Sequence, residues 1–134
     1  MNKRLERMAI SGPENRDLLL DDLNDNLQSS PIDEADARDL VADLSKMVAQ
    51  DGRAAVQESF FNVMATLYLR GIAQQSIERI ALDRVATLPV GAVCHVLEIV
   101  GASKLPSKRD LLSKFAEQDN PHLSALARAL LRAG

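Results

Sequence analysis

Apolar residues recur at intervals of three and four positions along most of the chain, which is the spacing that places them on one face of an α-helix. Glycine, proline and short polar stretches interrupt this pattern and divide the chain into eight pieces. These are a short basic segment that ends at Ser11-Gly12-Pro13, followed by residues 14–28, 33–50, 53–70, 73–87, 89–100, 108–118 and 121–134. We expect about seven of them to be helices in an all-α fold, because no stretch alternates apolar and polar residues long enough to predict a strand.

Three of these helices share a pattern of apolar residues when they are aligned on their closing glycines. The aligned segments are residues 60–71, 90–101 and 123–134, offset by 30 and 33 residues. The matching positions are Phe60, Val90 and Leu123; Val63, Val93 and Leu126; Met64, Cys94 and Ala127; Leu67, Leu97 and Leu130; and Gly71, Gly101 and Gly134. The pattern favours stacked antiparallel helix pairs that bury their apolar faces together. An irregular helical bundle is the alternative, because Leu-rich helices that end in glycine align easily.

The last of these units has further features in both of its helices. Leu105-Pro106 precedes Leu111, Leu112 and Phe115, the turn Asp119-Asn120-Pro121 follows, and the second helix contains Ala127-Arg128-Ala129-Leu130. This shape resembles a HEAT repeat, a family in which an aspartate-containing turn joins two helices. The resemblance extends over residues 53–134 and implies a short α-solenoid. We therefore predict one helical domain, residues 1–134, with acidic helices in 1–51 and a helical-repeat portion in 52–134.

The composition is that of a globular helical protein. Apolar residues make up 46% of the 134 residues and aromatic ones only 3%, so the core must be built from aliphatic side chains. No run approaches the ~20 apolar residues of a membrane span, and no secretory signal is visible, so the cytoplasm is the expected location. The single cysteine, Cys94, excludes an internal disulfide and is expected to be a buried, inert thiol.

Few residues suited to catalysis or ligand binding are present. The two histidines, His95 and His122, have no histidine or cysteine at metal-ligand spacing, and neither common glycine-rich nucleotide motif occurs. Asp22 and Asp33 have the spacing of a calcium loop, but Leu27 and Asp33 occupy the positions where that loop needs glycine and glutamate. We therefore expect no catalytic residues, no metal and no cofactor, although a pair of carboxylates could support acid-base chemistry by itself.

Charge is unevenly distributed along the chain. Residues 14–43 contain ten acids and two bases, a net charge of −8, whereas residues 52–134 carry +3 and the whole chain −3. Such a stretch can be a solvated helical surface, or one that attracts a basic protein and repels nucleic acid. The residues that we expect at a partner surface are Asp21, Asp22, Asp25, Asp33, Glu34, Asp36 and Asp39, and the concave face of the helix pairs is the second possibility. The milder basic group Lys104, Lys108, Arg109 and Lys114 is expected to be solvated.

A short acidic helical protein without catalytic residues resembles the immunity proteins that protect bacteria from their own polymorphic toxins, including those of contact-dependent growth inhibition. The resemblance implies a basic toxin domain, expected to be a nuclease, whose active site the protein blocks by steric and electrostatic occlusion. One alternative is a helical-repeat adaptor whose groove, with Phe60, Phe61 and Tyr68, takes an amphipathic segment of a signalling or transcription protein. Another is a solenoid that self-associates through its end faces. None of these functions needs a membrane, a small-molecule substrate or direct contact with nucleic acid.

Overall fold

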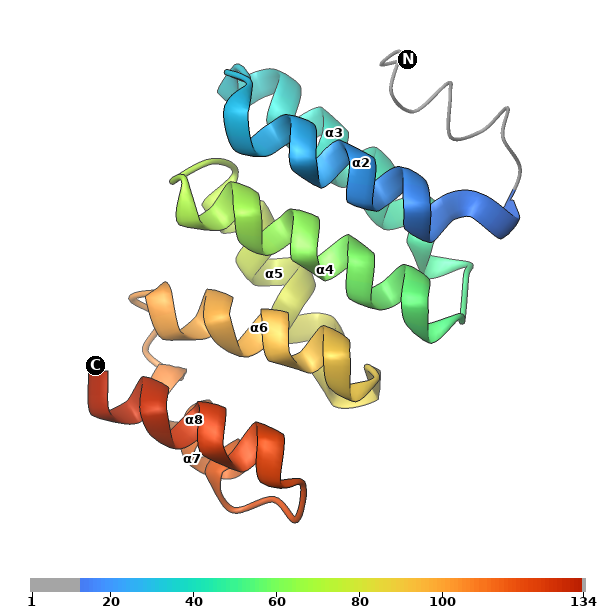
Figure 1. Ribbon diagram of the computed structural model, residues 1–134. Helices are drawn as coiled ribbons and strands as arrows, with labels where there is room; N and C mark the ends of the chain where they lie inside the picture. Colours follow the sequence, from blue (N-terminus) through green and yellow to red (C-terminus); the bar gives the residue numbers. More distant parts are fainter. Residues whose placement is uncertain (1–12, 134) are drawn as a thin grey trace.

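The computed structural model describes residues 13–133, which form seven α-helices and two short 3-10 helices and contain no strand (Figure 1). The elements are η1 (Pro13–Asn15), α2 (Arg16–Ser29), α3 (Glu34–Ala49), α4 (Ala54–Leu69), α5 (Gln74–Arg84), η2 (Val85–Thr87), α6 (Val90–Ala102), α7 (Lys108–Ala116) and α8 (Pro121–Ala133). The prediction of an all-α fold with about seven helices is therefore confirmed. The predicted basic N-terminal segment and Gly134 lie outside the described residues.

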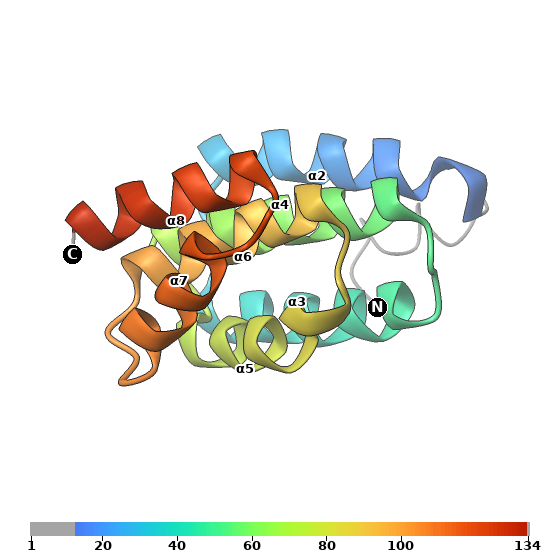
Figure 2. The ribbon, with the colours of Figure 1, turned by 90° about the horizontal axis from the view of Figure 1, so that it is seen from below.

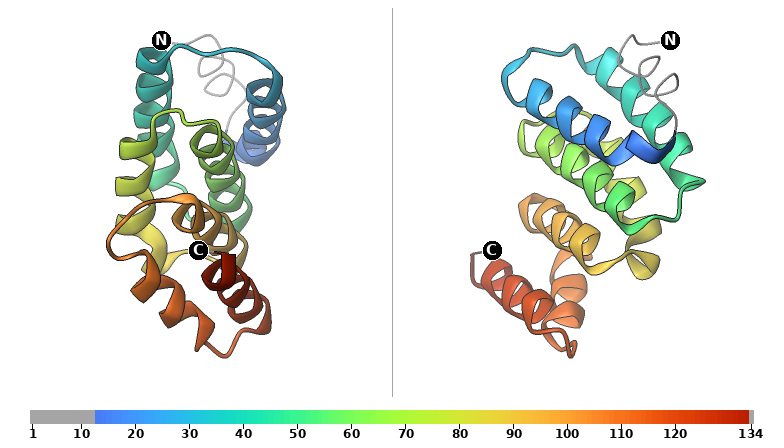
Figure 3. Two further views of the ribbon diagram at one scale, coloured as in Figure 1. Left: turned by 90° about the vertical axis from the view of Figure 1, so that its left-hand side faces the viewer. Right: turned by 45° about the vertical axis from the view of Figure 1, so that its right-hand side comes forward.

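The helices lie in two layers. α2, α4, α6 and α8 lie side by side in one layer, and α3, α5 and α7 form the other (Figure 2, Figure 3). α2 packs along α4, α4 packs along α6, and α8 packs against both α6 and α7, while α3 contacts α4 and α5. The chain thus alternates between the layers, and the pairs α3–α4, α5–α6 and α7–α8 follow one another along the stack. This is the arrangement of antiparallel helix pairs that the sequence predicts.

The acidic helix α2 is attached to α4 by polar as well as apolar contacts. Asn24 is buried, and its side-chain oxygen accepts a hydrogen bond from the hydroxyl of Thr66 in α4. Arg70, at the end of α4, donates to the carbonyl oxygens of Leu27 and Ser30 at the end of α2. A helix leaves its last carbonyl groups without partners, so this arginine stabilises the end of α2. α2 is thereby fixed as the first helix of its layer.

The helices α4, α6 and α8 occupy successive places in one layer, as the alignment of their apolar residues predicts (Figure 1). The matched positions are not equally buried, however: Phe60 and Leu123 are buried, whereas Val90 is 44% exposed. Leu97 lies in α6, between α4 and α8, and has no exposed surface. The repeat therefore predicts the order of the helices better than the surroundings of each residue.

The aligned glycines do not share one role. Gly71 has a φ of 78°, and its N–H and that of the next residue donate to the carbonyl groups of Tyr68 and Leu67, which is the Schellman motif that ends a helix. Gly101 was expected to end its helix but lies within the last turn of α6. A Cβ added there would come within 2.7 Å of a methyl carbon of Leu130 in α8. The prediction for Gly101 is wrong because this glycine permits two helices to approach closely and makes no turn.

Replacing Gly71 by alanine is expected to lower the free energy of unfolding by about 1 kcal/mol. Nothing lies within 4 Å of the added Cβ, so the loss comes from placing a side chain on a left-handed backbone. Urea unfolding followed by circular dichroism measures it. Gly52→Ala is the matched control, because Gly52 also has free space but no positive φ. Equal losses in the two variants would contradict the assignment.

Candidate partner-binding surface

Three of the predicted contact residues lie on α2. Asp21, Asp22 and Asp25 are all exposed. Asp21 and Asp25 are one helical turn apart and Asp22 is three residues before Asp25, so each is a neighbour of another on the helix surface. Their carboxylates form no hydrogen bond or ion pair within the described residues. Three negative charges on one side of α2 are therefore available to a partner.

The other four predicted contact residues lie at the start of α3 and along it. Asp33 directly precedes the helix, Glu34 and Asp36 lie in its first turn, and Asp39 lies in its second; all four are exposed. The carboxylates of the three aspartates again have no hydrogen bond or ion pair to another described residue. α3 belongs to the second layer, so the structure divides the seven acids between two layers at one end of the stack (Figure 2).

Glu34 already has a structural role. Its two carboxylate oxygens lie 3.0 and 3.1 Å from the backbone nitrogen of Ala73, which donates to them. Ala73 directly precedes α5 and has a left-handed backbone, with a φ of 52°. A carboxylate at this place satisfies an N–H group and interacts favourably with the dipole of α5. We therefore define the acidic surface as the remaining six residues: Asp21, Asp22, Asp25, Asp33, Asp36 and Asp39.

The acidic surface is not neutralised by Arg16, one of the two bases in residues 14–43. Arg16 instead forms an ion pair with Asp51, with an Nη1–Oδ2 distance of 3.1 Å. The Asp51 carboxylate also accepts hydrogen bonds from the backbone N–H and the guanidinium group of Arg53. These bonds, above all those from the Arg53 side chain, hold the pKa of Asp51 well below its usual range, although burial opposes them. Asp51 thus joins the start of α2 to the turn between α3 and α4.

Two acids outside residues 14–43 extend the negative charge to α4 and α6. A Cβ added to Gly91 of α6 would come within 2.5 Å of the Glu58 carboxylate, so the end of the Glu58 side chain lies against α6 at this glycine. Burial, followed by the charges of Glu98 and Glu58, raises the pKa of the Cys94 thiol. Sequence reasoning missed them because they are far apart in the chain, and only the contact between α4 and α6 brings them together.

The cysteine and the two histidines lie on α6 and α8. Cys94 is half-buried rather than buried as expected, and its raised pKa keeps it a neutral thiol. Nδ1 of His95 is buried, has no hydrogen-bond partner among the described residues, and lies 3.9 Å from a Glu98 carboxylate oxygen, too far for a hydrogen bond. His122 is exposed in the first turn of α8.

The aromatic residues predicted to line an adaptor groove belong to the core. Phe60 and Phe61 have no exposed surface and pack edge to face with ring centroids 4.9 Å apart, and the guanidinium group of Arg84 lies over both rings. Tyr68 is 2% exposed, and its hydroxyl donates to Glu78. The predicted groove is therefore wrong, because α4 lies between α2 and α6 and also contacts α3 and α5.

An apolar groove does exist elsewhere, where η2 and the start of α6 face α7 and α8. Its volume is about 260 Å³. Most of its lining residues are aliphatic or aromatic, with Lys114 and Gln118 as the polar members: Val85, Ala86, Leu88, Val90, Val93, Leu111, Phe115 and Leu123. Val90, which is 44% exposed, lies on its wall together with the buried Leu123.

Within residues 13–133, no group of three or more histidine, cysteine, aspartate or glutamate residues has the arrangement of a metal site. In the same part of the chain, no helix combines the length and apolar character needed to cross a membrane. Comparison with protein-family models, curated proteins and solved structures found no match for this chain.

Proposed function

We propose that this chain is a non-catalytic protein-binding module of the immunity type, which binds a basic bacterial toxin domain in the cytoplasm and blocks its active site. The acidic surface carries the proposal. Its six carboxylates are exposed, have no hydrogen bond or ion pair within the described residues, and lie on two consecutive helices at one end of the stack. Like charges at this density repel one another and lower the stability of the folded chain. A surface that served only for solvation would not need so many of them, so binding of a basic partner accounts for the surface better.

The expected mechanism is steric and electrostatic occlusion. A nuclease cleft must be basic to hold phosphates, and an acidic protein surface can occupy the same cleft while nucleic acid is repelled by it. Because Asn24 and Arg70 fix α2 to α4, its aspartates are held on a rigid support, and little conformational entropy is lost when a partner binds. Complementary charge would also accelerate association, an effect that weakens as salt increases.

The test is capture of partners from the native cell by the tagged chain, with mass spectrometry, at about 0.05 M and about 0.3 M salt. The wild type is expected to recover one basic domain at low salt and much less at moderate salt. The triple variant Asp21→Lys, Asp22→Lys, Asp25→Lys should lose this domain, with association at least about tenfold slower once the partner is purified. Co-expression of the wild type should suppress the toxicity of that domain.

A matched control reverses three acids at the other end of the stack. Asp110, Glu117 and Asp119 are exposed on α7 and directly after it, and their change to lysine alters the net charge equally. This variant should retain the partner. The proposal fails if both triple variants bind alike, or if the captured protein is acidic or binds independently of salt.

The apolar groove between η2 and α7 favours the adaptor as a second candidate function. Its lining would accept the apolar face of a partner helix, as helix-in-groove modules do. Such a partner would remain bound at moderate salt and would not depend on the aspartates of α2. The same capture experiment therefore separates the two candidates.

A further inference from the structure

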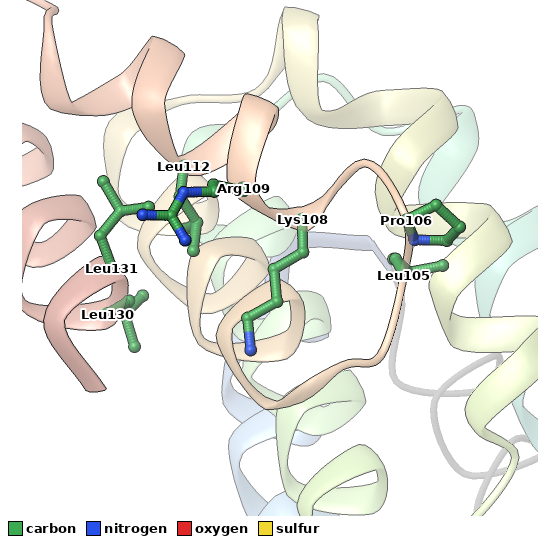
Figure 4. Close-up of a pocket in the computed structure, with 7 residues that line it drawn as sticks. All are labelled: Leu105, Pro106, Lys108, Arg109, Leu112, Leu130 and Leu131. Atoms are coloured by element: carbon green, nitrogen blue, oxygen red, sulfur yellow. The ribbon is translucent and has the colours of Figure 1, made fainter. Parts of the chain in front are cut away.

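The C-terminal end of the stack carries a pocket that combines an apolar floor with basic side chains. It has a volume of about 190 Å³ and is lined by Leu105, Pro106, Lys108, Arg109, Leu112, Leu130 and Leu131 (Figure 4). The two basic side chains come from the first turn of α7, and they lie between the leucines of α8 and the Leu105–Pro106 turn. A cavity of about 150 Å³ can hold a benzene-sized group, so this pocket can accept one branched aliphatic side chain.

The basic side chains at this pocket form no ion pair within the described residues, although the exposed acid Asp110 directly follows Arg109. Arg109 is exposed and has no ion pair within the described residues, and the Lys108 amine only approaches the Ser103 carbonyl oxygen, at 3.4 Å. Arg128 and Arg132 are exposed on the neighbouring helix α8. The basic residues here were expected to be solvated only, but two of them border an apolar pocket. Its ligand should therefore combine an aliphatic group with negative charge.

The opposite end of the same chain carries that combination. Leu18, on α2, is 60% exposed, which is the largest exposed fraction among the large apolar side chains of the described residues. Asp21 and Asp22 follow it by three and four residues, so both carboxylates lie next to Leu18 on the helix surface. α2 and the α7–α8 pair lie at opposite ends of the stack (Figure 1). Leu18 and the two acids beside it thus lie at the end of the stack opposite the pocket, whose apolar floor and basic side chains are complementary to them.

We propose that the chain associates head to tail with a second copy of itself. Leu18 of one copy inserts into the pocket beside Lys108 and Arg109 of the next copy. Asp21 and Asp22 then lie close to Lys108 and Arg109, and the ion pairs orient the contact. Because the two surfaces are different and lie at opposite ends, the contact is heterologous and leaves a free head and a free tail for further copies. This inference concerns the chain alone and does not rest on the proposed function, although both contacts use Asp21 and Asp22.

Sedimentation velocity of the purified chain, from low to high micromolar concentration at about 0.02 M salt, tests the contact. The weight-average mass is expected to rise at least twofold with concentration and to return to that of the monomer at about 0.5 M salt. Leu18→Asp removes the head and Arg109→Glu removes the tail, and each alone should remain monomeric. Both residues are exposed, so both variants should fold, which circular dichroism verifies.

Mixing the two variants provides the decisive observation. Each retains the surface that the other lacks, so the mixture should form dimers that do not grow further. Leu69→Asp is the matched control, because Leu69 is 59% exposed but lies at the end of α4 within the stack, and this variant should associate like the wild type. A wild type that is monomeric throughout, a mixture that stays monomeric, or an equal defect in Leu69→Asp would overturn the proposal. Arg109→Glu leaves the acidic surface intact, so its capture of a basic partner is judged separately.

Discussion

The Leu97→Asp variant is expected to be unfolded at 25 °C. Leu97 has no exposed surface, and α6 lies between α4 and α8, so the new carboxylate would be buried without a partner. Loss of the leucine alone costs about 2–5 kcal/mol, and burial of a polar group without a hydrogen bond adds roughly 2–7 kcal/mol. A domain of this size has a total stability of about 5–15 kcal/mol. Far-UV circular dichroism should therefore show the loss of most helical signal.

The same leucine-to-aspartate change at an exposed position shows whether the loss of stability comes from burial of the new carboxylate or from the change of residue type alone. Leu69→Asp places an aspartate at a site that is 59% exposed, and its melting curve should lie close to that of the wild type, within about 0.5 kcal/mol. If Leu97→Asp melted like the wild type, α6 could not be the central helix of the stack. The position of α4 relative to α6 and α8 would then be wrong as well.

The spacing of apolar residues was sufficient to predict the helices and their order. Each helix is long enough for its apolar residues to repeat several times, and glycine or proline marks most of the ends. The different roles of Gly71 and Gly101 could not be predicted from this spacing. Both stand at the end of an apolar stretch of sequence, yet Gly71 adopts a left-handed conformation after α4, and Gly101 lies inside the last turn of α6, opposite Leu130. The difference depends on a contact between α6 and α8, which the local sequence does not contain.

The candidate surface was only partly predictable for the same reason. The sequence predicts that Leu18, Leu19, Leu23 and Leu27 form the apolar face of α2. Leu23 and Leu27 are buried, but the prediction for Leu18 is wrong: it is 60% exposed, and Leu20 lies in the core instead. The bond between Glu34 and Ala73, and the proximity of Glu58 to α6, depend on helices that are distant in the chain. Apolar residues at helical spacing also give the same sequence pattern whether that face of the helix lines a groove or packs in the core, so the sequence cannot distinguish the two.

The like charges of the acidic stretch repel one another, so other contacts must keep α2 in its place in the fold. The end of α2 is held by Arg70, and its beginning is held through Arg16 and Asp51. Asp51 is itself an acid, but it is turned inward, with its side chain only 6% exposed. It therefore adds no charge to the acidic surface and instead forms ion pairs with Arg16 and Arg53. The attachment of the start of α2 therefore depends on the carboxylate of Asp51 remaining ionised.

Asp51→Asn is accordingly expected to lower the free energy of unfolding by about 2 kcal/mol at pH 7, since it weakens charge-assisted hydrogen bonds from Arg53 and Arg16. The pKa of Asp51 is lowered in the folded protein, so its contribution is complete above the ordinary carboxyl range near pH 4 and is lost as the pH falls toward the folded value. Urea unfolding at pH 7 and at about pH 3 should show a smaller difference between variant and wild type under the more acidic condition.

Asp43→Asn provides the control for this pH dependence. Asp43 is exposed on α3 and has no hydrogen bond or ion pair within the described residues, so the substitution should change the unfolding free energy by less than about 0.5 kcal/mol at either pH. A difference between Asp51→Asn and the wild type that stayed constant with pH would mean that ionisation of Asp51 does not stabilise the fold. The aspartates of α2 would then be held by the contacts with α4 alone, and loss of Arg70 or Asn24 should release them.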